Sequence, residues 1–270
     1  MSRLRGRPRR QRLTLAVLGA IVALVMLGPL LAPHAEDVVV SAPYAAGGDG
    51  GPLGTDVLGR DVLSRVLRGG GELLLTAALA ALGGTVLGSI VGLIAAVRRR
   101  WLGLLLERVT EIVLVVPGVL ILILVGTAIT DPSPLLVAAV LALLATPWVA
   151  RVVVAAAEPV IRTGYVEHAI ASGESTWSII TRDVAPNMRA TLLTLLGLRF
   201  VEAVYLVSAA AFLQVGPQPP EANWALMVRE NAQGVLLNPW ATAAPSLAIA
   251  AIAVAVTFAC DRHRMRETPL

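Results

Sequence analysis

The sequence predicts an all-α polytopic membrane protein with six transmembrane helices and with both termini in the cytoplasm. Three observations support this fold class. Of the 270 residues, 56% are hydrophobic and only 15% are charged, with a mean hydropathy of +0.76, which is more apolar than a soluble domain of this length requires. Six segments approach or exceed the ~20 apolar residues that cross a bilayer core. The basic residues, finally, gather on one side of these segments.

The orientation follows from the arginines. The predicted spans are, in chain order, 13–32, 73–97, 112–129, 135–157, 190–215 and 240–260. With the N-terminus inside, 16 of the 22 basic residues fall in inner segments, four in outer segments and two within spans. Because basic residues in short loops are retained on the cytoplasmic side, this asymmetry sets the topology. The net charge of +4 is then a topology signal, and we expect no nucleic-acid partner.

The N-terminal part is interpreted as a basic cytoplasmic tail, 1–12, followed by a retained first span. The apolar run of 13–32 exceeds the roughly 7 to 15 residues of a cleavable signal. An outer segment, 33–71, follows, and it is predicted to end in a short interfacial helix that starts near Asp61. Val62 with Val66 and Leu63 with Leu67 would form its apolar face, with Arg65 and Arg68 pointing elsewhere. A plain connector is the alternative interpretation.

The remaining spans and loops form a predicted permease-like core, 72–260. Three glycines at intervals of four, Gly84, Gly88 and Gly92, indicate a face for close helix packing. Pro117 and Pro147 are expected to bend their helices. An outer loop is predicted at 216–239 and a cytoplasmic tail at 261–270, while the single Cys260 is read as a packing residue.

Arg199 and Glu202 form a candidate intramembrane pair. They stand three residues apart in the fifth span, close enough to pair on one helix face. An unpaired charge there costs at least ~3 kcal/mol, so the pair is expected to face protein or water. A contact to substrate or ion and a purely structural lock are both open, and the structural lock is favoured.

The longest inner loop, 158–189, carries the most informative pattern. Its apolar residues recur at intervals of three and four, which predicts two short amphipathic helices on either side of Gly173. Such a helix beneath the membrane could act as a lever, or it could be a surface helix without a special role. Periodicity does not decide between these interpretations.

Several kinds of enzyme are disfavoured by what the sequence lacks. All 22 basic residues are arginine, and without lysine there is no Walker A motif to hold nucleotide phosphates. The sequence also has no H-E-x-x-H pattern, no cysteine pair and no G-x-S-x-G elbow. We therefore expect no catalytic residue, no metal site and no ATPase activity in this chain.

The inner loop resembles the EAA loop of permeases from ATP-binding-cassette importers. Glu167, Ala169, Gly173, Ile180 and Pro186 carry the match, whereas His168 and Ala185 replace the usual alanine and leucine. The outer stretch Pro52-Leu-Gly54-Thr55-Asp56-Val-Leu-Gly59-Arg60-Asp61 is similar to a motif of dipeptide and oligopeptide permeases of the DppC or OppC type. The stretches 211–227 and 238–240 are similar to that family as well.

The resemblance implies a type I importer fold and a multi-pass place in the bacterial inner membrane. The chain would form half of a pore with a second permease of the DppB or OppB type. Two cytoplasmic ATPases would bind ATP and Mg, so that this chain needs no cofactor, and an extracytoplasmic binding protein would deliver di- or oligopeptides. Residues 167 to 173 would dock on an ATPase as a coupling helix. Nickel-importing permeases share the framework, and a stand-alone secondary transporter or channel remains the main competitor.

Overall fold

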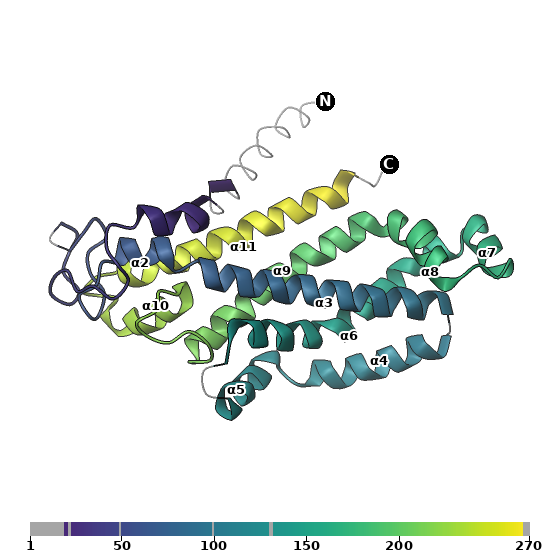
Figure 1. Cartoon of the computed structure of the whole chain (residues 1–270), viewed down its shortest axis with the longest axis horizontal. Coiled ribbons are helices and arrows are strands. Elements are labelled where there is room, and N and C mark those ends of the chain that lie inside the picture. The colour runs from purple at the N-terminus through teal and green to yellow at the C-terminus, as the bar shows by residue number, and fades with distance from the viewer. Residues whose placement is uncertain (1–18, 21–22, 49, 99, 130–131, 267–270) are drawn as a thin grey trace. The chain divides into compact units, whose positions relative to one another are not determined.

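The computed structural model describes residues 19–20, 23–48, 50–98, 100–129 and 132–266. These residues form helices joined by turns, and three isolated β-bridges lie in the outer segment (Figure 1). The predicted all-α membrane class is thereby confirmed. The basic tail 1–12, most of the first span and residues 267–270 lie outside the described residues. Of the first span, residues 19–20 and 23–31 are helical.

Four helical stretches of the described chain are long and apolar enough to cross a membrane. They are Val62–Arg98, Pro134–Ile161, Thr176–Phe212 and Trp240–Cys260, and they contain or overlap four of the six predicted spans. Their individual helices are α2 (Val62–Arg68), α3 (Gly71–Arg98), α6 (Pro134–Ile161), α9 (Arg189–Phe212) and α11 (Trp240–Arg266). The count of six spans and the cytoplasmic position of both termini stay predictions.

The predicted third span, 112–129, falls on two helices in the structure, with the bend at Pro117 that the sequence predicted. A helix, α4, already occupies Arg100–Val115, and a second, α5, occupies Gly118–Ala128. The stretches Gly103–Val113 and Gly118–Ala128 are bent by 69° relative to each other. Pro117 lies at this break, because proline lacks the amide hydrogen that a helix needs and disfavours helical geometry at the residue before it. The pair is therefore a broken span or a re-entrant segment. Pro147, by contrast, stays inside α6.

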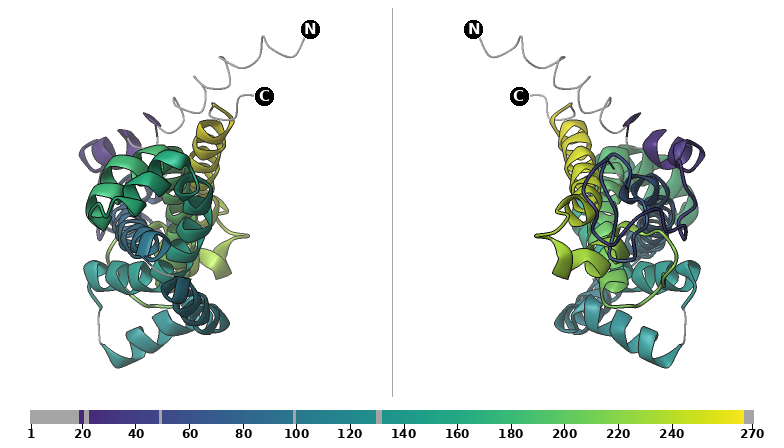
Figure 2. Two further views of the ribbon diagram at one scale, coloured as in Figure 1. Left: turned by 90° about the vertical axis from the view of Figure 1, so that its right-hand side faces the viewer. Right: turned by 90° about the vertical axis from the view of Figure 1, so that its left-hand side faces the viewer.

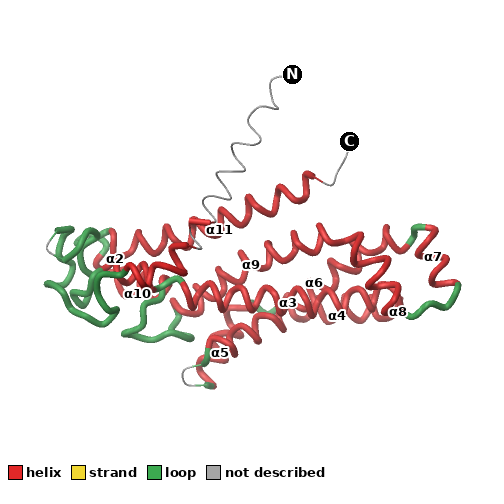
Figure 3. The backbone as a smooth tube through the Cα atoms, turned by 45° about the horizontal axis from the view of Figure 1, so that its top comes forward, coloured by secondary structure: helices red, strands yellow, loops and turns green. Residues whose placement is uncertain are grey.

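The chain forms two compact units. The first, here the cap unit, comprises Met1–Ala77, Leu122–Pro134 and Val204–Ala259. In it, α2 and α10 (Trp224–Asn231) lie among the long loops that Figure 3 draws in green. The loops of residues 33–60 face the viewer in the right-hand view of Figure 2.

The second unit, here the loop unit, comprises Ala78–Ile121, Leu135–Ala203 and Cys260–Leu270. The glycines at 84, 88 and 92 lie on α3 against α6. A Cβ atom added to Gly88 would lie 2.5 Å from the Cβ of Val149, and one added to Gly92 would lie 2.6 Å from the Ala150 carbonyl oxygen. Since real Cβ contacts of this length do not occur, these positions hold the two helices at a distance that only glycine permits.

The inner loop 158–189 belongs to the loop unit and faces the viewer in the left-hand view of Figure 2. It contains α7 (Gly164–Ala171), the single turn α8 (Thr176–Ser178), a π-helical turn, Ile179–Val184, and a 3₁₀ turn, Ala185–Met188. The prediction of two separate amphipathic helices is thus correct for the first helix. The second segment instead continues into α9, because its turns follow one another without a break.

Candidate functional site

Helix α7 begins after Thr163, whose backbone is extended at φ −77° and ψ 141°. The Thr163 hydroxyl donates to the Val160 carbonyl at 2.6 Å, which closes the end of α6. Within α7, Val166 and Ala169 are buried and stand three residues apart. One face of α7 is therefore held by packing, while the opposite face is exposed.

Beneath this face lies a hydrophobic cluster of the loop unit. Val166 and Ala169 pack there with Ile180 and Val184 from the π-helical turn. The other buried members of the cluster are Leu93, Val149, Val153, Ala157, Ile179, Met188 and Leu195. Two of the predicted coupling residues, Ala169 and Ile180, therefore fix the position of α7 and do not present a contact surface themselves.

Gly173 ends α7 in a left-handed turn. Its φ is +75°, a conformation that glycine adopts without the steric cost that a Cβ brings. The Gly173 amide donates to the Ile170 carbonyl and the Glu174 amide to the Ala169 carbonyl, each at 3.1 Å, which is the Schellman arrangement of a helix end. A Cβ at Gly173 would meet no atom within 4 Å. The constraint on this residue is the backbone angle and not the available space.

The outward face of the inner loop carries Glu167 and several exposed apolar side chains. Among the described residues, no hydrogen bond or ion pair engages the Glu167 carboxylate. Tyr165, Ile170 and Trp177 are exposed by 52%, 40% and 63%. A free carboxylate beside exposed aromatic and aliphatic groups is the chemistry of a surface that binds another protein.

The predicted Pro186 is also exposed, in the 3₁₀ turn that leads into α9. The inner loop is also bonded to α3, because Arg98 at the end of α3 donates from Nε to the Thr176 hydroxyl at 3.1 Å. This bond ties the start of α8 to a transmembrane helix. Because this bond is exposed to solvent, its contribution to stability is small.

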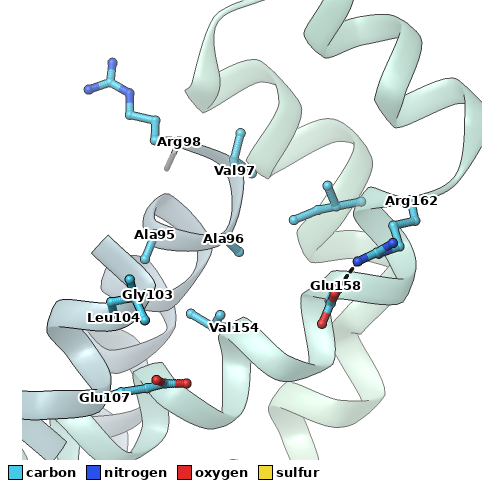
Figure 4. Close-up of a pocket in the computed structure, with 11 residues that line it drawn as sticks. Ala95, Ala96, Val97, Arg98, Gly103, Leu104, Glu107, Val154, Glu158 and Arg162 are labelled. Atoms are coloured by element: carbon cyan, nitrogen blue, oxygen red, sulfur yellow. Dashed lines mark hydrogen bonds and ion pairs between the residues drawn. The ribbon is translucent and has the colours of Figure 1, made fainter. Parts of the chain in front are cut away.

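A cavity of about 710 Å³ lies beside the inner loop, between the ends of α3, α4 and α6 (Figure 4). Ala95, Ala96 and Val154 give it an apolar wall. Four charged residues, Arg98, Glu107, Glu158 and Arg162, stand around it, and Arg162 donates to Glu158 at 2.6 Å. Charges of both signs therefore surround the cavity, and they select no particular ligand.

Arg199 and Glu202 pair on α9, with 2.5 Å between Arg199 Nη1 and Glu202 Oε2. The Arg199 guanidinium also lies over the ring of Trp148 on α6, 3.9 Å from the ring centroid. The Arg199 side chain is 13% exposed and that of Glu202 is 45% exposed. The positive member of the pair is thus enclosed and the negative member is accessible.

In the cap unit, the predicted outer motif folds into a buried charge cluster, here the cap cluster, of Asp56, Arg60, Arg65 and Glu230. Asp56 Oδ2 accepts from Arg60 Nε and from Arg65 Nη1, each at 2.7 Å. Glu230 Oε2 accepts from the same two arginines at 3.0 and 2.7 Å. Two positive and two negative charges cancel, which is the condition under which buried charges are tolerated.

The other motif residues shape the backbone around this cluster. The Thr55 hydroxyl donates to the Ala42 carbonyl at 2.6 Å. Asp61 caps α2 by accepting from the Leu63 and Ser64 amides at 3.2 Å, as the sequence predicted for the start of this helix. Gly54 and Gly59 have φ of +72° and +80° and contact the chain at Ala45 and Ser41. The whole stretch is a folding element of the cap unit.

The predicted orientation of Arg65 on α2 is therefore corrected, whereas the place of α2 at the membrane interface stays a prediction. Arg65, expected to point away from the packed face, is fully buried, as are Val62 and Ser64. The Trp224 indole donates to the Val66 carbonyl at 2.8 Å and closes over the helix. The hidden partner was Glu230, which lies 165 residues from Arg65. One sequence signal could have indicated this contact. Two arginines buried in the outer segment need two carboxylates, and Asp56 supplies only one of them.

Tyr44 is a further neighbour of the cap cluster that sequence analysis did not single out. Burial raises the pKa of the Tyr44 phenol above its ordinary value, and the negative charges of Asp56 and Glu230 raise this pKa further. Gly234 lies directly against the Tyr44 ring. The phenol is thus a neutral group that fills space beside the charges.

For the part of the chain that the structure describes, no group of three or more His, Cys, Asp or Glu side chains is arranged to hold a metal ion. Cys260 is buried. The inner loop thus presents Glu167 and exposed apolar side chains on its outward face, and the cap cluster is part of the fold of the cap unit.

Comparison with known families gives one match over most of the chain. Residues 84–264 match the family described as the inner membrane component of binding-protein-dependent transport systems. This range includes the inner loop, the intramembrane pair and α10, which carries Glu230.

Individual proteins that the chain resembles carry related descriptions. It is 34% identical over 214 residues to a putative peptide transport system permease protein of Brucella suis, covering 78% of this chain and 71% of that protein. It is 29% identical over 197 residues to the glutathione transport system permease protein GsiD of Pectobacterium atrosepticum, covering 73% and 65%. It is also 29% identical over 197 residues to the dipeptide transport system permease protein DppC of Alkalihalophilus pseudofirmus, covering 73% and 64%. The matched region thus spans about two thirds of the length of these relatives.

Proposed function

Because the chain belongs to the family of inner membrane components of binding-protein-dependent transport systems, we propose that it is a permease subunit that forms half of the pore of an ATP-driven peptide importer. It carries out no covalent chemistry itself. Cargo reaches the pore from an extracytoplasmic binding protein, and ATP with Mg is bound by two cytoplasmic ATPase subunits. A second permease completes the pore in the inner membrane.

The observation that carries this proposal is the exposed helix α7 on a rigid base. Val166 and Ala169 anchor it to the hydrophobic cluster, whereas Glu167 and Ile170 point outward. The Gly173 turn fixes where the helix ends. A short helix held in this way transmits a displacement of a bound ATPase to α6 and α9, since it cannot move independently of the cluster.

Peptide is the favoured cargo. The three relatives described above are named for a peptide, a dipeptide and glutathione, and each of these molecules contains peptide bonds. This agreement favours a peptide over a nickel complex. A stand-alone secondary transporter is disfavoured, because such proteins work without the ATPase-binding helix that α7 resembles.

The test is purification of the tagged chain in detergent with whatever subunits accompany it. We expect a second permease and ATPases to co-elute and peptide-loaded binding protein to stimulate ATP hydrolysis. Glu167→Ala should lower that stimulation about tenfold, the scale of one lost charge-assisted hydrogen bond. Glu174→Ala removes an exposed carboxylate of the same loop and serves as the control. A chain that elutes alone and moves solute in liposomes without ATP would contradict the proposal.

A further inference from the structure

The accessible carboxylate of Glu202 is unexplained by the coupling function. It stands on α9, inside a stretch, Thr176–Phe212, that is apolar and long enough to cross the membrane. Its side chain is 45% exposed. A carboxylate in contact with hydrocarbon is costly, because lipid cannot replace its hydration. Glu202 therefore faces water or another polar group in the assembled protein.

Arg199 makes a polar partner from another subunit unnecessary. The ion pair of 2.5 Å already neutralises Glu202 within the same helix. Trp148 covers the guanidinium from α6 at 3.9 Å, and this contact holds Arg199 on the enclosed side. The outward oxygen of the Glu202 carboxylate still needs solvation. A water-filled path beside α9 would supply it.

Leu198 shares the exposed side of the helix with Glu202. It lies four residues earlier and is 45% exposed, so the two side chains are neighbours on one face. Apolar surface beside one carboxylate suits the part of a ligand where a positive group stands next to apolar atoms. The protonated amino group of a peptide fits this description, whether at its N-terminus or on a lysine side chain.

We propose that Glu202 lines an aqueous translocation path and binds the ammonium group of the peptide in transit, with Arg199 and Trp148 as positioning residues. This inference rests on the proposed function, since it assigns the cargo contact of the same subunit. Arg199 keeps the carboxylate in place, and the ammonium group takes the carboxylate oxygen that Arg199 does not use.

The first test measures water access and charge without relying on transport. In the co-purified complex, Leu198→Cys is combined with Cys260→Ser and exposed to a cationic and an anionic methanethiosulfonate reagent. We expect both to react, the cationic one about fivefold faster, because Glu202 attracts a positive charge at this range. Adding Glu202→Gln should abolish that preference. Absence of reaction, or equal rates with Glu202 present, overturns the inference.

Glu111→Gln is the matched control. Glu111 pairs with Arg108 at the same spacing and in the same chain order, at 3.2 Å, but both side chains are more than half exposed. We expect this substitution to leave the reagent preference unchanged. If Glu111→Gln abolishes the preference as well, the effect is not specific to Glu202 and the inference fails.

The second test identifies the source of the ammonium group. Uptake of tri-alanine and of alanyl-lysyl-alanine is measured with wild type, Glu202→Gln and Glu202→Asp. If Glu202 binds the N-terminal ammonium group, Glu202→Gln should take up both peptides about tenfold more slowly. If it binds the lysine ammonium group, only the lysine peptide should be slowed. In either case Glu202→Asp should restore uptake. Unchanged uptake overturns the inference, as does a loss that aspartate does not restore. A wild-type complex that takes up neither peptide contradicts the proposed function instead.

Discussion

Glu230 is the residue on which the charge balance of the cap cluster depends. Glu230→Gln leaves Arg60 and Arg65 with Asp56 as their one remaining carboxylate, so that one buried positive charge is uncompensated. We expect the free energy of unfolding to fall by about 3 to 5 kcal/mol, as when one partner of a buried pair is removed. Thermal unfolding in detergent measures the effect.

Glu221→Gln is the control for that experiment, because Arg65 bonds the Glu221 carbonyl and not its exposed side chain. Its unfolding temperature should match that of the wild type. An equal loss in both variants would mean that removal of any outer carboxylate destabilises the cap unit, and the account of the cap cluster would then be wrong.

Gly173 is constrained by its φ of +75°. Gly173→Ala should cost about 1 to 2 kcal/mol in the turn, the usual price of a left-handed residue with a Cβ, and should lower peptide-stimulated ATP hydrolysis of the complex. Gly173→Asn should retain more activity, since asparagine tolerates this conformation better. Size alone should matter little, because the space around Gly173 is open.

Gly164→Ala supplies the comparison within α7, where an added Cβ also meets no atom within 4 Å but where φ is not in the left-handed region. The complex that contains this variant should hydrolyse ATP at the rate of the wild-type complex. Equal impairment at positions 164 and 173 would point to the surface of α7, and not to the turn, as the sensitive feature.

At the scale of elements, the contact of α3 with α6 depends on Gly88. Gly88→Val brings side-chain atoms into the space of Val149, and overpacking of this kind costs about 1 to 3 kcal/mol. We expect a lower unfolding temperature of the purified chain. Gly103→Ala, at a position with open space on α4, should leave that temperature unchanged; a loss of equal size there would argue against the packing role.

The long helices were predictable from the sequence because their signal is local. Apolar length alone indicated most of α6 and α9. The start of α4 at Arg100 was not predictable in this way, because Glu107, Arg108 and Glu111 interrupt its apolar sequence before the uninterrupted apolar run that begins at 112. The break at Pro117, in contrast, follows from one residue.

The candidate site was predictable in part for the same reason. Glu167 and Gly173 lie in one short motif, and the exposed carboxylate and the left-handed turn are local properties. The burial of Arg65 depends on Glu230, which is far away in the chain. No pattern within the outer motif indicates that contact, because the motif does not contain the partner.

For the whole molecule, the arginine distribution predicts which side of the membrane each loop faces. In a Cys260→Ser background, Asp37→Cys should react with an impermeant thiol reagent in intact cells. Ala171→Cys, on exposed α7, should react only after the membrane is permeabilised. The opposite pattern would reverse the topology and place the inner loop where no ATPase is available.

The cap cluster also determines when the protein can finish folding in the cell. Arg60 and Glu230 are separated by 170 residues. At a ribosomal rate of about 5 to 20 residues per second, roughly 9 to 34 seconds pass between the synthesis of the two. During this interval Arg60 and Arg65 are already part of the growing chain, whereas Glu230 has not yet been synthesised. The cluster is therefore completed late in synthesis, and in a chain truncated before residue 230 Arg60 and Arg65 would have only Asp56 as a carboxylate partner.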